Sequence, residues 1–218
     1  MANYRISNPP NNLTMLDVKA NLDAFGGPAK QCRFAVKIVP TGSQNVLNQL
    51  GYGSFIRDLT LLCEATELPG RGFDIAEVRY YGPSFQMPQN TKYNNDMPMT
   101  FICRTGSYER QLFDDWLECI NPTNSFDFNY PESYRCQIHV YQLAEAGDQR
   151  VIAGGNTPTA GKAVYAWTLQ QAWPQLVNPQ QVTWSDDDIL RLQVTFAYRY
   201  WSRPNRDLAP VTQGALQQ

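Results

Sequence analysis

Polar and apolar residues alternate almost without interruption along residues 190–201, which read LRLQVTFAYRYW. The apolar positions are Leu190, Leu192, Val194, Phe196, Tyr198 and Tyr200. A period of two residues predicts a β-strand whose apolar face packs on a core. The opposite face stays polar for about ten residues, roughly twice the length of an ordinary strand. This chain must therefore form a sheet with one buried face and one long polar face.

The same alternation recurs elsewhere and predicts strands at 32–39, 58–68, 73–82, 97–105, 134–143 and 163–173. Pro69-Gly70 favours a turn, because proline cannot donate to a strand ladder. We expect the strands 73–82 and 97–105 to pair, with residues 83–96 as a long hairpin loop. Connections longer than about 12 residues usually have a function. Residues 40–57 read as a second long loop that carries at most one helical turn.

One segment, SYERQLFDDWLECI, has its apolar residues at spacings of three and four. This spacing predicts an amphipathic helix over 108–120, with Ser107 as the N-cap and Asn121-Pro122 at its end. A single helix among many strands predicts a mainly β fold, an antiparallel sandwich or barrel with one flanking helix.

We expect a single domain over residues 1–218. Its parts are an N-terminal arm (1–31), a β core (32–203) that includes the helix at 107–120, and a polar C-terminal tail (204–218).

The formal net charge of −2 excludes a basic excess that could neutralise phosphates, so tight nucleic-acid binding is not expected. No apolar run approaches the roughly 18 residues of a membrane span. The start, MANYRISNPPNN, lacks the charged and apolar regions of a signal peptide. We therefore expect folding in a cytoplasm and no membrane partner.

Residue types that support catalysis are scarce. The one histidine, His139, falls within a predicted strand and reads as a half-exposed strand residue. Residues 155–162, GNTPTAGK, resemble a phosphate loop but have five residues between the glycines instead of four, and Ala163 follows where Ser or Thr is required. We expect no catalytic residue and no cofactor.

Metal sites are not expected either. Asp186–Asp188 lack the spacing of a calcium loop and read as a solvated turn. An odd number of cysteines without CxxC spacing argues against a disulfide framework and against a zinc site. We expect buried structural thiols at Cys32, Cys63, Cys103, Cys119 and Cys136.

Several further segments occur in a characteristic order over residues 32–203. They are CEATELPGRGFD, VRYYGPSFQMPQNTKYNNDMPMTFI, ERQLFDDWLECI, FNYPESY, AWP at 172–174 and WSDDDILRLQVTFAYRYW. Together they resemble the tail tube proteins of contractile-tailed bacteriophages. The resemblance implies the tail-tube (Hcp-like) fold of two packed antiparallel sheets with a flanking helix, which type VI secretion and contractile injection tubes share.

The resemblance also implies a structural function without enzymatic activity. Copies of the chain would form a ring, a hexamer, and rings would stack into a hollow tube inside a contractile sheath that conducts DNA during ejection. The implied partners are further copies of the chain, the tail sheath protein, the baseplate tube-initiator and tail terminator proteins, and the tape measure protein and DNA in the lumen, without tight or sequence-specific binding. The implied location is the virion, after assembly in the bacterial host cytoplasm.

Carried over by position, residues 69–72 would be a turn between strands and 130–134 the entry to the next strand. The loop 83–96 would reach a neighbouring subunit or ring. The expected contact residues are Pro83, Ser84, Phe85, Gln86, Met87, Pro88, Gln89, Asn90 and Tyr93.

If sheets of neighbouring subunits join edge to edge, the polar face of the last strand lines the lumen. The lumen-facing candidates are Arg191, Gln193, Thr195, Arg199, Glu64, Glu67 and Asp74. The sequence leaves open whether Arg191 and Arg199 face the channel or pair with acidic residues such as Glu64, Glu67, Asp74 or Glu77.

Two alternatives remain. The arm, the loops 40–57 and 144–162 and the tail leave room for a baseplate tube-initiator protein of the same fold. A monomeric β-sandwich that binds carbohydrate or protein would instead use exposed aromatic residues, with Trp167, Trp173, Trp184 and Trp201 as candidates. The tail tube protein and the baseplate initiator both predict rings or tubes at low micromolar concentration. The β-sandwich predicts a monomer.

Overall fold

The structure is a computed structural model that describes residues 29–42, 45–79, 81–143, 163–185 and 188–203, together with Met15 and Lys19. The chain divides into two compact units, Met1–Phe34 with Gln142–Val164, and Ala35–Tyr141 with Tyr165–Gln218. The second unit holds most of the described strands and is the one described below. The loop 144–162, the phosphate-loop-like segment within it and the tail after Arg203 lie outside the described residues, and the division into arm, core and tail stays a prediction.

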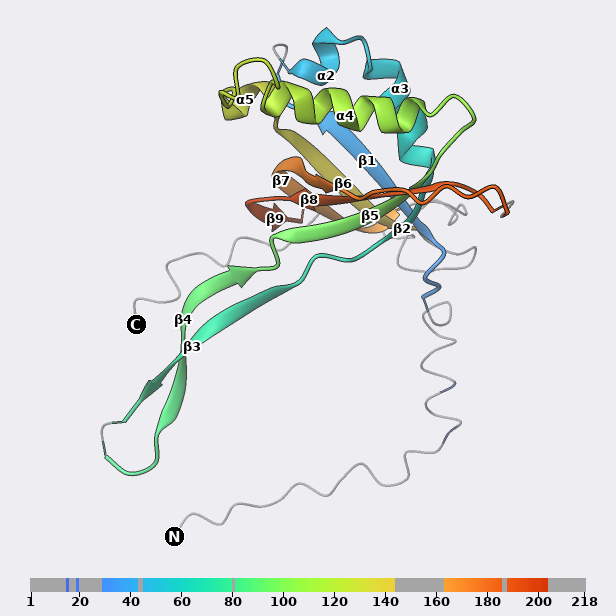
Figure 1. Ribbon diagram of the computed structural model, residues 1–218. Coiled ribbons are helices and arrows are strands. Elements are labelled where there is room, and N and C mark those ends of the chain that lie inside the picture. Colours follow the sequence, from blue (N-terminus) through green and yellow to red (C-terminus); the bar gives the residue numbers. More distant parts are fainter. Residues whose placement is uncertain are drawn as a thin grey trace, which may run out of the picture. The chain divides into compact units, whose positions relative to one another are not determined.

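The main sheet has seven strands and is antiparallel where its register is defined. They are β1 (Phe34–Pro40), β2 (Cys63–Thr66), β5 (Asp96–Ile102), β6 (Cys136–Leu143), β7 (Ala163–Val177), β8 (Arg191–Ala197) and β9 (Tyr200–Ser202). Hydrogen bonds connect them in the order β1-β6-β7-β8-β5-β2, and β9 pairs with β7 (Figure 1). The predicted mainly β, antiparallel fold is confirmed.

The long strand β7 belongs to two parts of this sheet. Its residues 168–170 pair with β9, and its residues 173–177 pair with β8. Between these stretches Gln171 has a φ of 57°, a left-handed conformation that is uncommon for residues other than glycine. The register also shifts between Pro174 and Leu176, which is typical of a β-bulge. These two irregularities let one strand change partners along its length.

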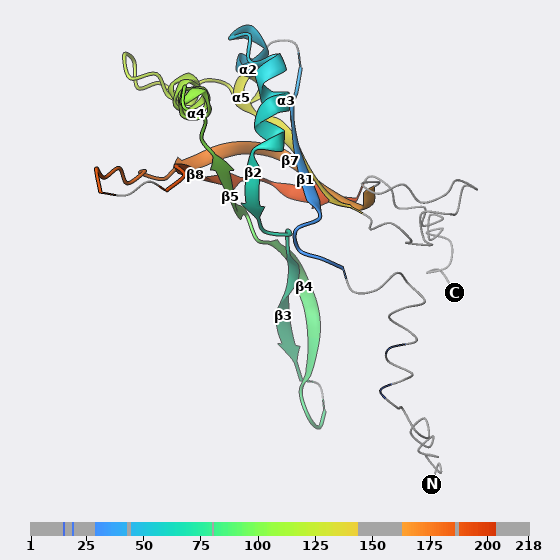
Figure 2. The same cartoon turned by 90° about the vertical axis from the view of Figure 1, so that its right-hand side faces the viewer.

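The predicted helix is confirmed as α4 (Tyr108–Ile120), which packs on one side of the sheet (Figures 1 and 2). Its Phe113 ring lies 5.4 Å from that of Phe101 in β5 and 5.9 Å from that of Phe196 in β8. Trp116 is fully buried and its Nε1–H donates a 2.9 Å hydrogen bond to the carbonyl of Tyr134. The core therefore lies between α4 and the apolar sheet face, as the spacing predicts.

The start of α4 differs from the prediction, because the Ser107 side chain makes no capping hydrogen bond and the residue has a φ of 49°. Glu109 holds this end of the helix instead. Its fully buried carboxylate accepts hydrogen bonds from Arg104 Nε at 2.7 Å and from the Arg104 backbone N–H at 3.2 Å. The Arg104 guanidinium lies 4.9 Å from the Phe55 ring centroid, so it also connects α4 to the preceding helical segment.

Two helices, α2 (Val46–Gln49) and α3 (Gly53–Leu61), occupy residues where the sequence predicts a loop and the first part of the strand 58–68. The one helical turn allowed in the loop agrees with α2, whereas α3 contradicts the rest of the loop and the first part of the strand, which is confirmed only over β2. The buried Asn45 explains the first helix, since its Oδ1 accepts from the Leu47 N–H at 3.1 Å and caps α2. Among the α3 side chains that the structure describes, Ile56 and Leu59 are buried, a spacing of three that is typical of a helix.

The predicted pairing of 73–82 with 97–105 is also wrong. Residues 71–78 form β3 (Arg71–Val78), which pairs with β4 (Phe85–Tyr93) in a separate two-stranded sheet. β5 pairs with β8 and β2. Most of the predicted loop 83–96 is therefore the strand β4, and the hairpin connection is only the segment between Val78 and Phe85.

The strand predicted over 190–201 is interrupted. β8 ends at Ala197, where the Tyr198 N–H donates to the Asn95 carbonyl and the Arg199 N–H donates to the Gln170 carbonyl. The chain thus leaves β5 and continues along β7 as β9. A further helix, α5 (Pro131–Tyr134), is a single turn before β6, at the predicted strand entry.

Candidate assembly surfaces

The alternation along β8 separates a buried face from a polar one. Leu192, Val194 and Phe196 are fully buried, whereas Arg191 and Gln193 are exposed. Gln193 accepts a 2.9 Å hydrogen bond from the Asn178 side chain, which follows β7. The polar face therefore extends from β8 toward its neighbour in the sheet.

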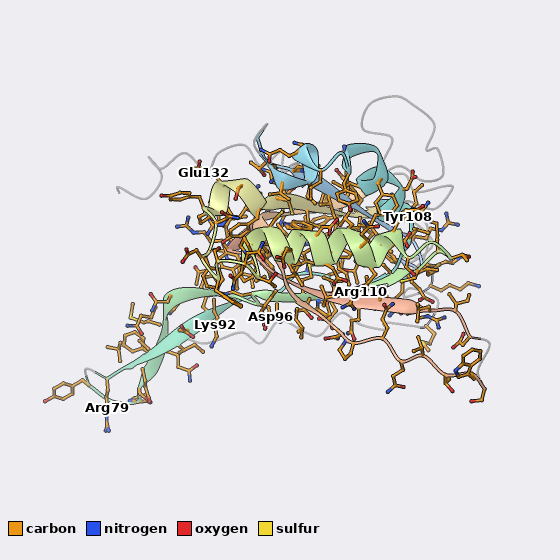
Figure 3. All side chains as sticks on the ribbon, turned by 45° about the horizontal axis from the view of Figure 1, so that its top comes forward. Arg79, Lys92, Asp96, Tyr108, Arg110 and Glu132 are labelled. Atoms are coloured by element: carbon orange, nitrogen blue, oxygen red, sulfur yellow. The ribbon has the colours of Figure 1, made fainter. Side chains whose placement is uncertain are left out.

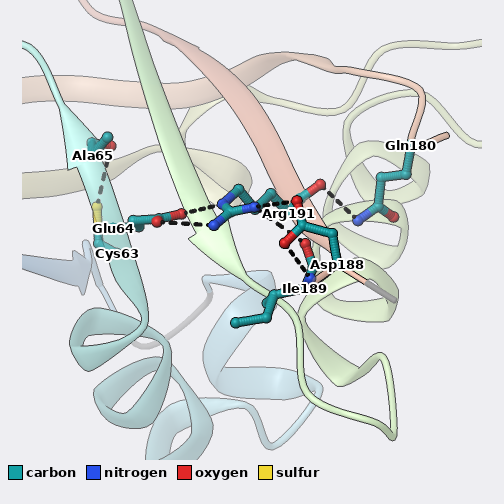
Figure 4. Close-up of polar contacts among 7 residues, drawn as sticks. All are labelled: Cys63, Glu64, Ala65, Gln180, Asp188, Ile189 and Arg191. Carbon is teal, nitrogen blue, oxygen red and sulfur yellow. Dashed lines mark hydrogen bonds and ion pairs between the residues drawn. The ribbon is translucent and has the colours of Figure 1, made fainter. Parts of the chain in front are cut away.

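Arg191 is paired with acidic residues on this face (Figure 4). Its Nε–H donates to Glu64 Oε2 at 2.7 Å, and its Nη1 lies 3.4 Å from Asp188 Oδ2. Because β5 separates β2 from β8 in the sheet, the contact with Glu64 spans three strands. The hydrogen bond and charge of Glu64 raise the pKa of Arg191, so the guanidinium stays charged and locally neutralised. Arg191 is therefore paired with acidic residues, and its place on a channel wall stays a prediction.

The other lumen-facing candidates do not all lie together. Arg199 is exposed between β8 and β9, and Glu67 is exposed just after β2. Asp74 lies in the two-stranded sheet, where its Oδ1 is 3.8 Å from Lys92 Nζ of the paired strand. The structure thus brings Arg191 to Glu64 and places Asp74 on a different surface.

A second polar stretch, on β6 and β7, is absent from the predicted candidates. His139 Nδ1 lies 2.8 Å from Thr168 Oγ1, and Gln137 Nε2 donates to Gln170 Oε1 at 3.0 Å. Gln137 and Gln170 line a groove of about 600 Å³. The other residues that line it are Thr41, Gly42, Glu132, Arg135 and Gln171. The alternation CQIHVYQ is the signal for this face, since Gln137 and His139 fall between buried residues.

The hairpin β3–β4 exposes apolar residues on both of its faces. Alternate residues along a strand share a face, so Phe73 and Ile75 lie on one face of the hairpin. Residues directly opposite each other in an antiparallel pair also share a face, so the pairs Ala76–Met87 and Val78–Phe85 lie on the other. Phe73 is 55% exposed and Ile75 is 61% exposed. The side chains project on both sides of the ribbon, with Arg79 toward the tip and Lys92 toward the base (Figure 3).

All nine residues expected to contact neighbouring copies lie in this hairpin, in β4 or just before it. The residues of β3 other than Asp74 are not among the predicted candidates, because the sequence pairs 73–82 with the wrong strand. The alternation of Phe73, Ile75 and Glu77 is a signal that could have identified them.

The main sheet ends in two outer strands, β1 and β2. Within the part of the chain that the structure describes, each is hydrogen-bonded to a strand on one side only, β1 to β6 and β2 to β5. An outer strand presents unpaired backbone N–H and C=O groups, which can bind a further strand.

The cysteines are all free thiols, and the prediction that all are buried is wrong. Cys136 is buried and burial raises its pKa, whereas Cys32 is exposed and the other three are partly exposed. Cys32 precedes β1 and so lies outside the sheet core.

Among the described residues, no group of three or more His, Cys, Asp and Glu side chains could hold a metal ion. His139 is half-buried, as predicted.

The four tryptophans that could form a ligand platform have separate surroundings. Trp173 packs edge-on against Tyr134, Trp167 contacts Tyr165, and Trp201 Nε1–H donates to the Gly70 carbonyl at 3.0 Å. Trp184 is fully exposed in the segment between β7 and β8.

A comparison with protein-family models matches residues 29–204 to the family described as phage tail tube protein. The chain belongs to the phage tail tube protein family. As a member, it is a structural subunit of a tail tube. A comparison with curated proteins gives no match. Of the helices that the structure describes, none is long and apolar enough to cross a membrane.

Solved structures share the fold of this tail tube protein at low identity. A chain of the sheath-tube complex of an extracellular contractile injection system (PVC, extended state) matches with a TM-score of 0.54 and 15% identity, over 88% of this chain and 98% of that one. A chain of the anti-feeding prophage baseplate matches with a TM-score of 0.52 and 12% identity, over 81% and 95%. A chain of the anti-feeding prophage cap matches with a TM-score of 0.50 and 15% identity, over 81% and 90%. These matches establish the fold.

Proposed function

We propose that copies of this tail tube protein close into rings through their outer strands and that the rings stack through the β3–β4 hairpin into a hollow tube. The outer strands β1 and β2 support the ring, because pairing β1 of one copy with β2 of the next would use both free edges. A closed ring also prevents the uncontrolled edge pairing to which open sheets are prone.

The observation that carries the proposal is the hairpin with apolar residues on both faces. An isolated two-stranded hairpin is marginally stable in water, and it usually needs packing against another element. Phe73 and Ile75 on one face and Phe85 and Met87 on the other are all exposed. Cover on both faces by neighbouring copies would remove this apolar surface from water and fix the hairpin.

We place the polar sheet face toward the lumen of the tube. A conduit for DNA must not hold phosphates, so positive charge on its wall has to be neutralised. Arg191 meets this requirement through its contacts with Glu64 and Asp188. The neighbouring Gln137, Gln170 and Gln193 are uncharged, so DNA and a tape measure protein could pass without tight binding.

The partners outside the tube itself follow from the proposed tube assembly. The tube would lie inside a contractile sheath and end at a terminator and at a baseplate initiator, and the similar chains from a sheath-tube complex, a baseplate and a cap support this. The ring would be a hexamer, assembled in the host cytoplasm and carried in the virion. Family membership indicates a structural, non-enzymatic role.

Electron microscopy of the purified protein tests the proposal together with the double variant Phe73→Ser/Ile75→Ser. Wild type at low micromolar concentration should form rings and tubes. The double variant should keep its circular dichroism spectrum and lose long tubes, because it removes apolar cover without touching the core. Thr91→Ser, opposite Phe73 in the hairpin, is the matched control and should form tubes normally.

Two results would contradict the proposal. A wild-type protein that stays monomeric when concentrated would rule out ring closure by the outer strands. Normal tubes from the double variant would show that the hairpin does not connect rings. Wild-type rings that never extend into tubes would instead favour the baseplate initiator, a reading to which the similar baseplate chain gives some support.

A further inference from the structure

A short segment after α4 that is neither helix nor strand, residues 126–130, exposes three aromatic side chains and is called the aromatic strap. Phe126, Phe128 and Tyr130 are 73%, 76% and 86% exposed. Between them, Asn129 fastens the segment to the end of α4, since its backbone N–H donates to the Ile120 carbonyl at 3.1 Å and its Nδ2 to the Cys119 carbonyl at 2.7 Å. The strap is thus held in place while its aromatic rings remain in solvent.

The sequence stretch that contains the strap is acidic. Residues 118–132 contain Glu118, Asp127 and Glu132 and no lysine or arginine, so this stretch carries a formal charge of −3. All three carboxylates belong to exposed residues. Aromatic faces next to carboxylates bind a cationic side chain well, because the ring faces and the carboxylates both attract positive charge. The strap is therefore suited to a partner that offers an arginine or lysine together with apolar or aromatic surface.

The tip of the β3–β4 hairpin has this chemistry. Among residues 79–84, Arg79 is the one charged residue, and Tyr81 is fully exposed. Arg79 Nε–H donates to the Gly82 carbonyl at 3.2 Å, so the arginine is fixed within the turn.

Within one copy the tip and the strap are far apart. The hairpin extends from the sheet on the side away from α4, as both ribbon views show (Figures 1 and 2). In Figure 3 the labelled Arg79 lies near the hairpin tip and the labelled Glu132 lies at the upper edge, well away from it. The two surfaces therefore can meet only between different copies.

We propose that the aromatic strap receives the hairpin tip of a second copy of this chain in the next ring, with Arg79 against the ring faces and Asp127. The inference rests on the proposed tube assembly and names the surface that the hairpin contacts. Two different surfaces on opposite sides of a subunit make a head-to-tail contact, which repeats without closing and so builds a tube of any length.

A charge exchange tests this contact. Arg79→Glu and Asp127→Arg, each alone, should reduce the fraction of subunits in tubes by about tenfold or more, since each replaces an attraction by a repulsion. The combined variant, with both charges exchanged, should restore tubes. Arg203→Glu makes the same arginine-to-glutamate change at an exposed residue outside the hairpin and should leave tubes intact. Tube content is measured by sedimentation and negative-stain microscopy.

The aromatic part of the strap is tested by Phe128→Ser, with Trp184→Ser as the matched control at another fully exposed aromatic residue. Phe128→Ser should lower tube content by about tenfold, and the control should not. Unchanged thermal unfolding in all variants confirms that folding is intact.

The outcomes separate this inference from the proposed function. Normal tubes from Arg79→Glu or Phe128→Ser, or no rescue by the exchange, would overturn the strap contact and leave the tube assembly standing. Intact tubes that no longer bind a contractile sheath would assign the strap to the sheath protein and would also overturn it. A wild type without rings or tubes would overturn the proposed function itself.

Discussion

Replacing Trp116 by alanine should strongly destabilise this tail tube protein. The side chain is fully buried, with ring centroids of Phe113 and Phe196 each 6.2 Å away. A buried aromatic side chain of this kind removes about 150–250 Å² from water, or about 4–6 kcal/mol at about 25 cal/mol per Å². Alanine retains part of that burial, so we expect a loss of about 3–5 kcal/mol in the free energy of unfolding.

The indole also makes a hydrogen bond that alanine cannot make. Losing it leaves the Tyr134 carbonyl without that donor, which costs about 1 kcal/mol and moves the expected loss toward its upper end. Trp116→Phe separates the two contributions, because it keeps most of the apolar contact and should cost about 1–2 kcal/mol.

The assay is denaturant unfolding of the protein at a concentration where it is monomeric, since assembly adds to apparent stability. Trp184→Ala is the matched control at a fully exposed tryptophan, and it should change the free energy of unfolding by less than about 0.5 kcal/mol. A loss below about 1 kcal/mol for Trp116→Ala would refute the reasoning, because α4 would then not be docked on the sheet.

Two further predictions concern polar groups of the same unit. Glu109→Ala should lower the free energy of unfolding by about 1.5–3 kcal/mol, because it removes the buried acceptor of Arg104 Nε. Glu109→Gln should lower it less, because glutamine keeps an acceptor. A decrease for Glu109→Ala as small as that for a surface residue would contradict this prediction. Burial, with a smaller effect of Lys37, lowers the pKa of His139 in the folded protein below the ordinary value of 6.5, so the unfolded chain binds this proton more tightly. The stabilising contribution is therefore fully present above the unfolded-state pKa and is lost as pH falls from there toward the folded-state pKa. His139→Gln should flatten the stability profile between about pH 7 and 5, and an unchanged slope would argue against the buried site.

Local patterns predict α4 and the faces of β8 correctly, because each pattern has a single structural meaning. Leu112, Phe113 and Trp116 fall on one helical stripe, and no strand could bury all three on one side. Along β8, the residues Leu192, Val194 and Phe196 fit only a strand with one buried face. The family resemblance reaches the same fold from the order of the segments.

Ambiguous patterns fail where tertiary contacts decide. Leu59 and Leu61 fit a strand as well as a helix, and the buried Asn45, with its bonds to Leu47 and to Arg135 of a distant segment, favours the helical arrangement of this region. The alternation of 85–93 is weak, because the side chains of β4 are exposed and polar residues separate the apolar ones.

The amino-acid sequence by itself determined the mainly β class, the position of α4 and the buried face of β8, since hydrophobic periodicity acts over neighbouring residues. Only the tertiary structure decided that β3 pairs with β4, that Arg191 reaches Glu64 and that Asn129 holds the aromatic strap on α4. These features depend on strand register and on contacts between residues far apart or across turns. A one-residue shift in register reverses every face, and no local pattern fixes that choice.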